Sequence, residues 1–250
     1  MHPSAMTTPT AIRPDPPVPA FPGRWVGGIS LILGPLLLLA GLLLRFPIDF
    51  FFPAQLAAAV AEPRRLDTAY AAVTAGYLLL WPAVIVLAQQ IAATHPGLAR
   101  WAGIFVIAGL LGRMFHAGAD HLAFQFARAM GATAATAEVA ATYGAFHIVK
   151  VINPMIMAGW VILAVGAYRA GLLGLGRAGG LALMAGVPLG VLKGTTLFSL
   201  LGAGGLGLAC VPLGIRLLRR GPRPAVPALI GWVVGIAALG LAFALLGQAG

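Results

Sequence analysis

Charged residues are scarce in this 250-residue chain: they make up 9% of it, against 60% hydrophobic residues. A soluble domain needs far more charge to cover its surface, so this composition excludes an ordinary water-soluble protein. Apolar runs of about 20 residues, the length that crosses a bilayer, recur along the chain. The bilayer is therefore the expected solvent, and the expected class is a multi-pass membrane protein.

Cysteine is nearly absent, and the alternating pattern of membrane barrels is missing. The single Cys210 excludes an internal disulfide and has no neighbouring His or Cys at metal spacing. The apolar runs are too long for barrel strands of about ten residues, and backbone groups in lipid must be satisfied within each segment. The expected fold class is all-α, a polytopic transmembrane helical bundle.

Acidic residues are also few: six of them face 16 Lys and Arg, which gives a net charge of +10. In a soluble protein this excess would indicate nucleic acid, but no basic patch with interleaved aromatic residues accompanies it. Orientation in a membrane explains the excess better. No nucleic-acid partner is predicted, and the expected partner is membrane lipid.

The chain divides into a tail and one membrane domain. Residues 1–24 are rich in Pro, Thr and Ala, which predicts a disordered cytoplasmic tail. Residues 25–250 are predicted to form a single transmembrane domain with about seven spans. The predicted spans lie near residues 25–45, 69–93, 101–128, 138–168, 177–193, 196–218 and 225–248. Residues 177–218 could instead form one span with a re-entrant segment, but two spans are favoured.

The basic residues predict the orientation. With the amino terminus inside and the carboxyl terminus outside, the inner segments hold nine basic residues and one acidic residue, whereas the outer ones hold five and four. Cytoplasmic connections retain Lys and Arg, so this split fits a protein of the bacterial plasma membrane. The first outer loop, 46–68, is rich in Phe and Ala between prolines, which predicts a short interfacial helix.

Two polar stretches interrupt the apolar pattern at membrane depth. In the third predicted span, Arg113, His116 and Asp120 share one helical face. The fourth predicted span carries Tyr143, His147, Lys150 and Asn153, of which the first three share a face. A short loop makes these spans antiparallel neighbours. The predicted pairs at equal depth are Asp120 with His147, His116 with Lys150, and Arg113 with Asn153, around a pocket that opens outward.

Ionisable groups are costly in hydrocarbon and are therefore functional candidates. The candidate proton-handling or catalytic residues are Asp120, His147 and His116. The candidate substrate-binding residues, including two anion clamps, are Arg113, Lys150, His121, Tyr143 and Asn153. These residues predict an acid-base enzyme or a binder for a lipophilic substrate with an anionic or polar head, such as a lipid or isoprenoid. Whether the protein is an enzyme stays open.

Other functions compete with this hypothesis. The same groups could relay protons or gate a solute in a small transporter, or they could form a structural clasp in a non-catalytic membrane subunit. A metal bound by the histidines is disfavoured because Arg113 and Lys150 would repel a cation. No metal is predicted, and nothing in the sequence assigns haem or another cofactor, or an oligomeric state.

Three segments carry a resemblance: FFPAQLAAAVAEPRRLDTAY, RMFHAGADHLAF and YGAFHIVKV. Over residues 25 to about 170 the chain resembles small uncharacterised bacterial seven-helix membrane proteins. That resemblance implies a membrane location and no particular activity.

Overall fold

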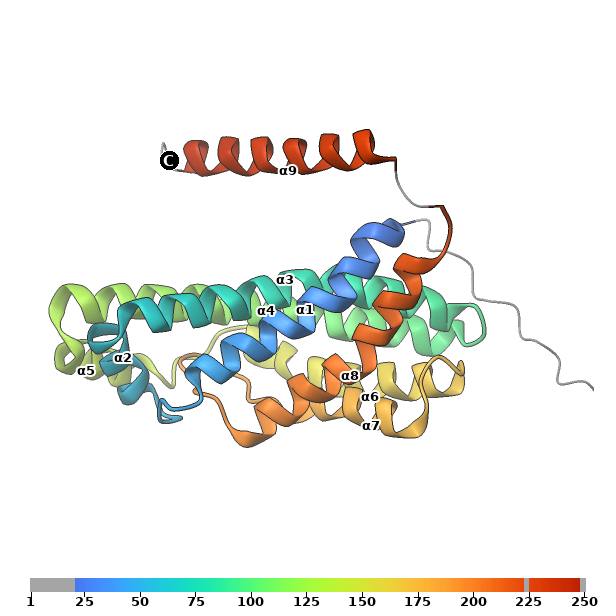
Figure 1. Ribbon diagram of the computed structural model, residues 1–250. Helices are drawn as coiled ribbons and strands as arrows, with labels where there is room; N and C mark the ends of the chain where they lie inside the picture. Colours follow the sequence, from blue (N-terminus) through green and yellow to red (C-terminus); the bar gives the residue numbers. More distant parts are fainter. Residues whose placement is uncertain (1–20, 223–224, 248–250) are drawn as a thin grey trace, which may run out of the picture. The chain divides into compact units, whose positions relative to one another are not determined.

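A computed structural model describes residues 21–222 and 225–247, and these residues are almost entirely helical (Figure 1). The all-α prediction is confirmed for this part of the chain. The predicted tail, 1–24, lies outside the described residues except for its last four. The elements in chain order are α1 (Gly23–Arg45), α2 (Phe52–Ala61), α3 (Pro63–Ala92), α4 (Pro96–Met130), α5 (Ala132–Thr142), α6 (Val149–Arg169), α7 (Leu175–Ala182), the 3-10 helix η1 (Leu183–Gly186), α8 (Leu197–Arg219) and α9 (Val226–Gly247).

Six of the described helices are long and apolar enough to cross a membrane: α1, α3, α4, α6, α8 and α9. The chain is accordingly a multi-pass membrane protein. Five of these helices coincide closely with predicted spans. The helix predicted within the loop 46–68 is also present, as α2.

The predicted span at 177–193 is not one continuous helix. The chain forms α7 and η1, twelve residues in all, and then continues without helical structure over residues 187–196. Pro188 has no N–H to donate and disfavours helical backbone at Val187, while Gly190 adopts φ +127°. We call residues 187–196 the connecting segment.

The predicted span at 138–168 is wrong in its first third. Helix α5 ends at Thr142, residues 143–148 form turns and a stretch without regular structure, and α6 begins only at Val149. Gly144 lies at this break, and glycine weakens a helix because its unfolded backbone has more freedom to lose. Tyr143 and His147 therefore do not share a helical face with Lys150.

The described chain separates into two compact units, one that ends at Leu218 and one that begins at Arg219. The second unit contains α9, which has no ionisable residue and is apolar on every side. That pattern is typical of a membrane span.

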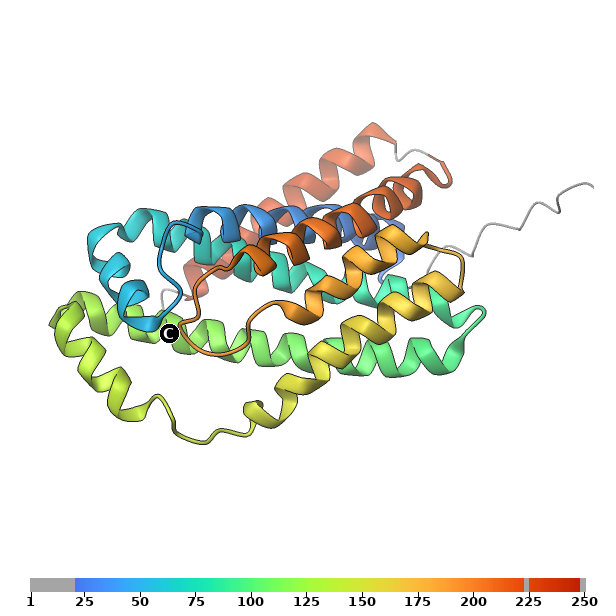
Figure 2. The same cartoon turned by 90° about the horizontal axis from the view of Figure 1, so that it is seen from below.

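Within the first unit, α1 packs along α3 and α4 packs along α6 (Figures 1 and 2). Glycines permit the close approach: a Cβ at Gly41 would lie 2.5 Å from the Ala69 carbonyl oxygen, and one at Gly109 would clash with Ile156. Small residues serve this purpose in membranes, where lipid gives helices no hydrophobic reason to associate.

The two ends of the first unit differ in structure. One end holds α2, α5, the loop 143–148 and the connecting segment, and we call it the α2–α5 end (Figure 2). The opposite end holds the starts or ends of long helices, the start of the short helix α7, and short turns. Every irregular backbone segment of more than five residues between two helices in the first unit lies at the α2–α5 end.

Candidate functional site

Arg113 lies in the middle of α4 and is 9% exposed. Its guanidinium donates hydrogen bonds to the carbonyl oxygens of Pro188 at 2.5 Å and Val187 at 3.0 Å. These carbonyls follow η1, where the helical hydrogen-bond pattern has ended, so Arg113 supplies the donors that the backbone lacks. Its Nε atom is buried without a hydrogen-bond partner.

Asp120 lies two turns further along the same face of α4 and is 6% exposed. Its Oδ1 accepts a 2.5 Å hydrogen bond from the Leu192 amide. Leu192 is fully buried and has φ +53°, a left-handed conformation that costs a non-glycine residue about 1–2 kcal/mol. The carboxylate therefore holds a strained part of the connecting segment in place.

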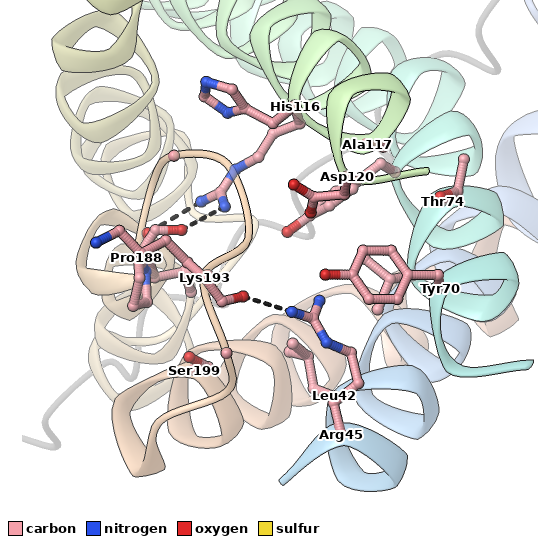
Figure 3. A pocket seen from close by; sticks show the side chains of 16 residues that line it. Leu42, Arg45, Tyr70, Thr74, His116, Ala117, Asp120, Pro188, Lys193 and Ser199 are labelled. Atoms are coloured by element: carbon pink, nitrogen blue, oxygen red, sulfur yellow. Dashed lines mark hydrogen bonds between the residues drawn. The ribbon is translucent and has the colours of Figure 1, made fainter. Parts of the chain in front are cut away.

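Arg45, in the last turn of α1, faces the connecting segment from the other side (Figure 3). It is 5% exposed and donates to the carbonyl oxygen of Lys193 and, at 3.4 Å, to Gln55 Oε1. Its guanidinium carbon lies 4.1 Å from the centre of the Tyr70 ring. The hydroxyl of Tyr70 points between Arg45 and Asp120 (Figure 3).

A cavity of about 50 Å³ lies between these groups. Its walls come from α1, α3, α4, the start of α8 and the connecting segment, and its polar lining includes Arg45, Tyr70, Arg113, His116, Asp120 and Lys193. Such a volume holds a few water-sized groups. Neither α6 nor the loop 143–148 contributes a lining residue.

The charges that line the cavity do not balance. Three cationic side chains, Arg45, Arg113 and Lys193, accompany the single carboxylate of Asp120. The only ion pairs among the described residues are Arg65 with Glu62 and Arg128 with Asp67, both elsewhere. The cavity therefore has a net excess of positive charge in surroundings that screen it poorly.

His116 also lines the cavity and is 4% exposed, with both ring nitrogens buried and without a hydrogen-bond partner. The ring of His147 lies against it, with centroids 5.9 Å apart, and stacks on Phe115 at 5.1 Å. The predicted pair of Asp120 and His147 is not hydrogen bonded. The break at 143–148 displaces His147 from the position that a continuous helix would give it.

The other predicted site residues lie outside the cavity. Tyr143 donates a 3.2 Å hydrogen bond to the Val191 carbonyl oxygen, and Lys150 donates one of 3.0 Å to that of Gly144. His121 is exposed on α4, and the Asn153 side chain lies near Gly112. The predicted pairs of His116 with Lys150 and of Arg113 with Asn153 form no hydrogen bond.

Arg45, Tyr70 and Lys193 line the cavity but were not among the predicted site residues. A signal for Arg45 exists, because it closes the uninterrupted apolar run of α1 and so must lie close to the membrane. No group of three His, Cys, Asp or Glu residues that could hold a metal is found in the described part of the chain.

No protein-family model, curated protein or solved structure matches this chain. The function is therefore argued from the site alone.

Proposed function

We propose that this multi-pass membrane protein binds the anionic or strongly polar head of a lipophilic molecule in the cavity beside the connecting segment. The observation that carries the proposal is the uncompensated charge: three cationic side chains and one carboxylate line one small buried cavity. Burying charge in a membrane protein is costly, and the usual reasons for it are a partner or a substrate.

Unsatisfied polar atoms around the cavity support a ligand. The Nε atoms of Arg45 and Arg113 and both ring nitrogens of His116 are buried without partners. Each buried group left without a hydrogen bond costs about 1–3 kcal/mol, so a species that offers acceptors here is favoured. A purely structural clasp would be expected to satisfy all its own members.

The site is proposed to face outward. Arg24, Arg100, Arg169, Arg177 and Arg216 belong to the end opposite the α2–α5 end. The positive-inside tendency then assigns that end to the cytoplasm and the cavity to the outer side. We propose that α7, η1 and the connecting segment together form the seventh membrane crossing. The connecting segment reaches the outer side, since the Gly194 amide donates a hydrogen bond to the Phe50 carbonyl oxygen, just beyond the end of α1.

The broken crossing favours a second candidate, a small transporter. Transporters use discontinuous helices whose ends meet the substrate near irregular backbone, and the end of η1 beside Arg113 has this arrangement. Uptake of a solute into proteoliposomes, absent from the Arg113→Gln protein, would favour transport over binding.

Mass spectrometry of lipids that co-purify in mild detergent tests the proposal. The wild type is expected to retain an anionic or polar lipophile that the Arg113→Gln and Lys193→Gln proteins lose. Arg64→Gln is the control, since Arg64 is exposed in the first turn of α3 and does not line the cavity. Equal retention by all four folded proteins, or retention of nothing, would leave the structural clasp as the better explanation.

A further inference from the structure

The proposed function leaves the chemistry of the head group open, and the cavity narrows it. We infer that the group bound is a doubly charged phosphate, either a phosphate monoester or the terminal phosphate of a diphosphate, carried by an apolar chain. This inference rests on the proposed function and adds the ligand class.

The charge count favours a dianion. Arg45 on α1, Arg113 on α4 and Lys193 on the connecting segment contribute three positive charges, and Asp120 removes one. The remaining excess of two matches a phosphate monoester, whose charge is about −1.5 to −2 at neutral pH, better than a carboxylate or a phosphodiester with a single charge. The other polar lining groups are the Tyr residues and Thr74 of α3, His116 and Ser199, and they do not change the sign of the excess.

The hydrogen-bonding groups point the same way. The polar atoms without partners around the cavity include the Nε–H donors of Arg45 and Arg113, and these belong to different helices. A phosphate monoester presents three strong acceptor oxygens, which can face donors on several sides at once, whereas a carboxylate has two oxygens in one plane. Arg45 lines the cavity from α1 and Arg113 lines it from α4, so a group that meets both donors must offer acceptors in more than one direction.

Lys193 supplies the third positive charge, and no carboxylate of the described chain neutralises it. Its Nζ lies 5.3–5.6 Å from the ring centres of Phe50, Phe51 and Tyr143, and it forms no ion pair within the described chain. Rings at this distance hold an ammonium in place while leaving its charge intact. The lysine is half-buried, so it can act on a group that enters the cavity from the α2–α5 end.

The size of the cavity indicates which part of the ligand it holds. A volume of about 50 Å³ holds the phosphate group and little more, so an attached hydrocarbon chain must lie outside the cavity, in lipid. The shared chemistry is the phosphate dianion, and free phosphate is the other source that an experiment must separate from a phospholipid-like molecule.

Binding to the full-length protein in dodecyl maltoside can be measured at pH 7.5 with three probes: monodecyl phosphate, decanoate and inorganic phosphate. We expect monodecyl phosphate to bind at least about tenfold tighter than decanoate, since charge-assisted hydrogen bonds contribute more than 1.4 kcal/mol each. Lys193→Gln should weaken the binding of monodecyl phosphate about five- to tenfold and that of decanoate less. A charge of −2 interacts with each positive charge twice as strongly as a charge of −1 does. Arg64→Gln should change neither.

The pH dependence gives a readout that does not depend on any variant folding. With a second pKa of about 6, the dianionic fraction of monodecyl phosphate rises about fourfold between pH 5.5 and pH 7.5. Its affinity relative to decanoate should rise by the same factor. Titration of Asp120, His116 and other protein groups acts on both probes, so the ratio removes the part of that titration that the two probes share.

The outcomes separate the two proposals. Equal affinity for decanoate and monodecyl phosphate, or a flat pH ratio, overturns the phosphate inference and leaves a general anion-binding site. Equal affinity for inorganic and monodecyl phosphate upholds the phosphate group but overturns the lipophilic ligand of the proposed function. Failure of all three probes to bind the folded wild type overturns the phosphate inference and the anionic head of the proposed function.

Discussion

The two ends of the first unit are built on the same long helices in opposite ways. Towards the end opposite α2 and α5, glycines and aliphatic side chains interlock, with Trp160, Leu31 and Leu87 almost wholly buried. At the α2–α5 end, charged side chains hold irregular backbone around a cavity. Shape complementarity stabilises the first region, whereas hydrogen bonds from buried ions stabilise the second. We therefore expect the first to tolerate polar change poorly but need no ligand, and the second to respond to ligands.

The largest loss of stability is expected from disrupting the interlocked packing of glycines and aliphatic side chains. Gly109→Leu would force its side chain into Ile156 across the α4 and α6 contact, and overpacking of this kind costs about 3 kcal/mol or more. Thermal unfolding in detergent should drop strongly, or the protein should not accumulate. Gly118→Leu is the matched control, because no atom lies within 4 Å of a Cβ at that position of the same helix.

A smaller effect is expected when Arg113 is replaced by Met. The carbonyls of Val187 and Pro188 lose their donors in a buried site, at a cost of about 2 kcal/mol. Hydrogen exchange should rise in the connecting segment while the α1 and α3 contact stays protected. Uniform exchange across all helices would contradict the idea that the two regions are held separately.

Asp120→Asn should cost about 1 kcal/mol, because an amide oxygen can still accept the Leu192 N–H but without a charge. Asp120→Leu removes the acceptor and should cost more. Denaturant unfolding of both proteins measures which variant has the lower free energy of unfolding. If the leucine variant were the more stable of the two, the carboxylate would not be what holds Leu192 in its left-handed conformation.

Lys193→Gln is expected to affect ligand binding rather than stability. Stability should change by no more than about 0.5 kcal/mol, since the side chain is half-buried and only its charge is removed. Ligand retention should nevertheless fall, as proposed above. A large loss of stability with unchanged retention would make Lys193 a structural residue.

Much of the fold was predictable because apolar length alone determines a membrane helix. The runs that became α1, α3, α4, α8 and α9 needed no tertiary information. The crossing near 177–193 was different. Pro188 and Gly190 permit a break, but whether the helix continues depends on Arg113 and Asp120, which lie more than 65 residues earlier and satisfy the backbone that the break exposes.

The site residues on α4 were predictable from the sequence, but the groups that face them were not. Arg113, His116 and Asp120 keep their common face because α4 is continuous. Their predicted partners at Tyr143, His147 and Lys150 depended on a helix that ends at Thr142 and resumes at Val149. The actual hydrogen-bond partners of Arg113 and Asp120 are backbone groups of the connecting segment, which no sequence pattern marks as partners.

The length of α4 has a consequence for how a ligand would arrive. Its 35 residues extend about 52 Å, well beyond a hydrocarbon core of about 30 Å, so part of the helix stands at or above the lipid head groups or the helix tilts. Asp120 lies ten residues before the last residue of the helix, Met130, in the final third of its length. Access would then be lateral, from neighbouring lipids in a two-dimensional pool. Occupancy would follow the mole fraction of the ligand in one leaflet, so even a weak affinity could keep the site filled.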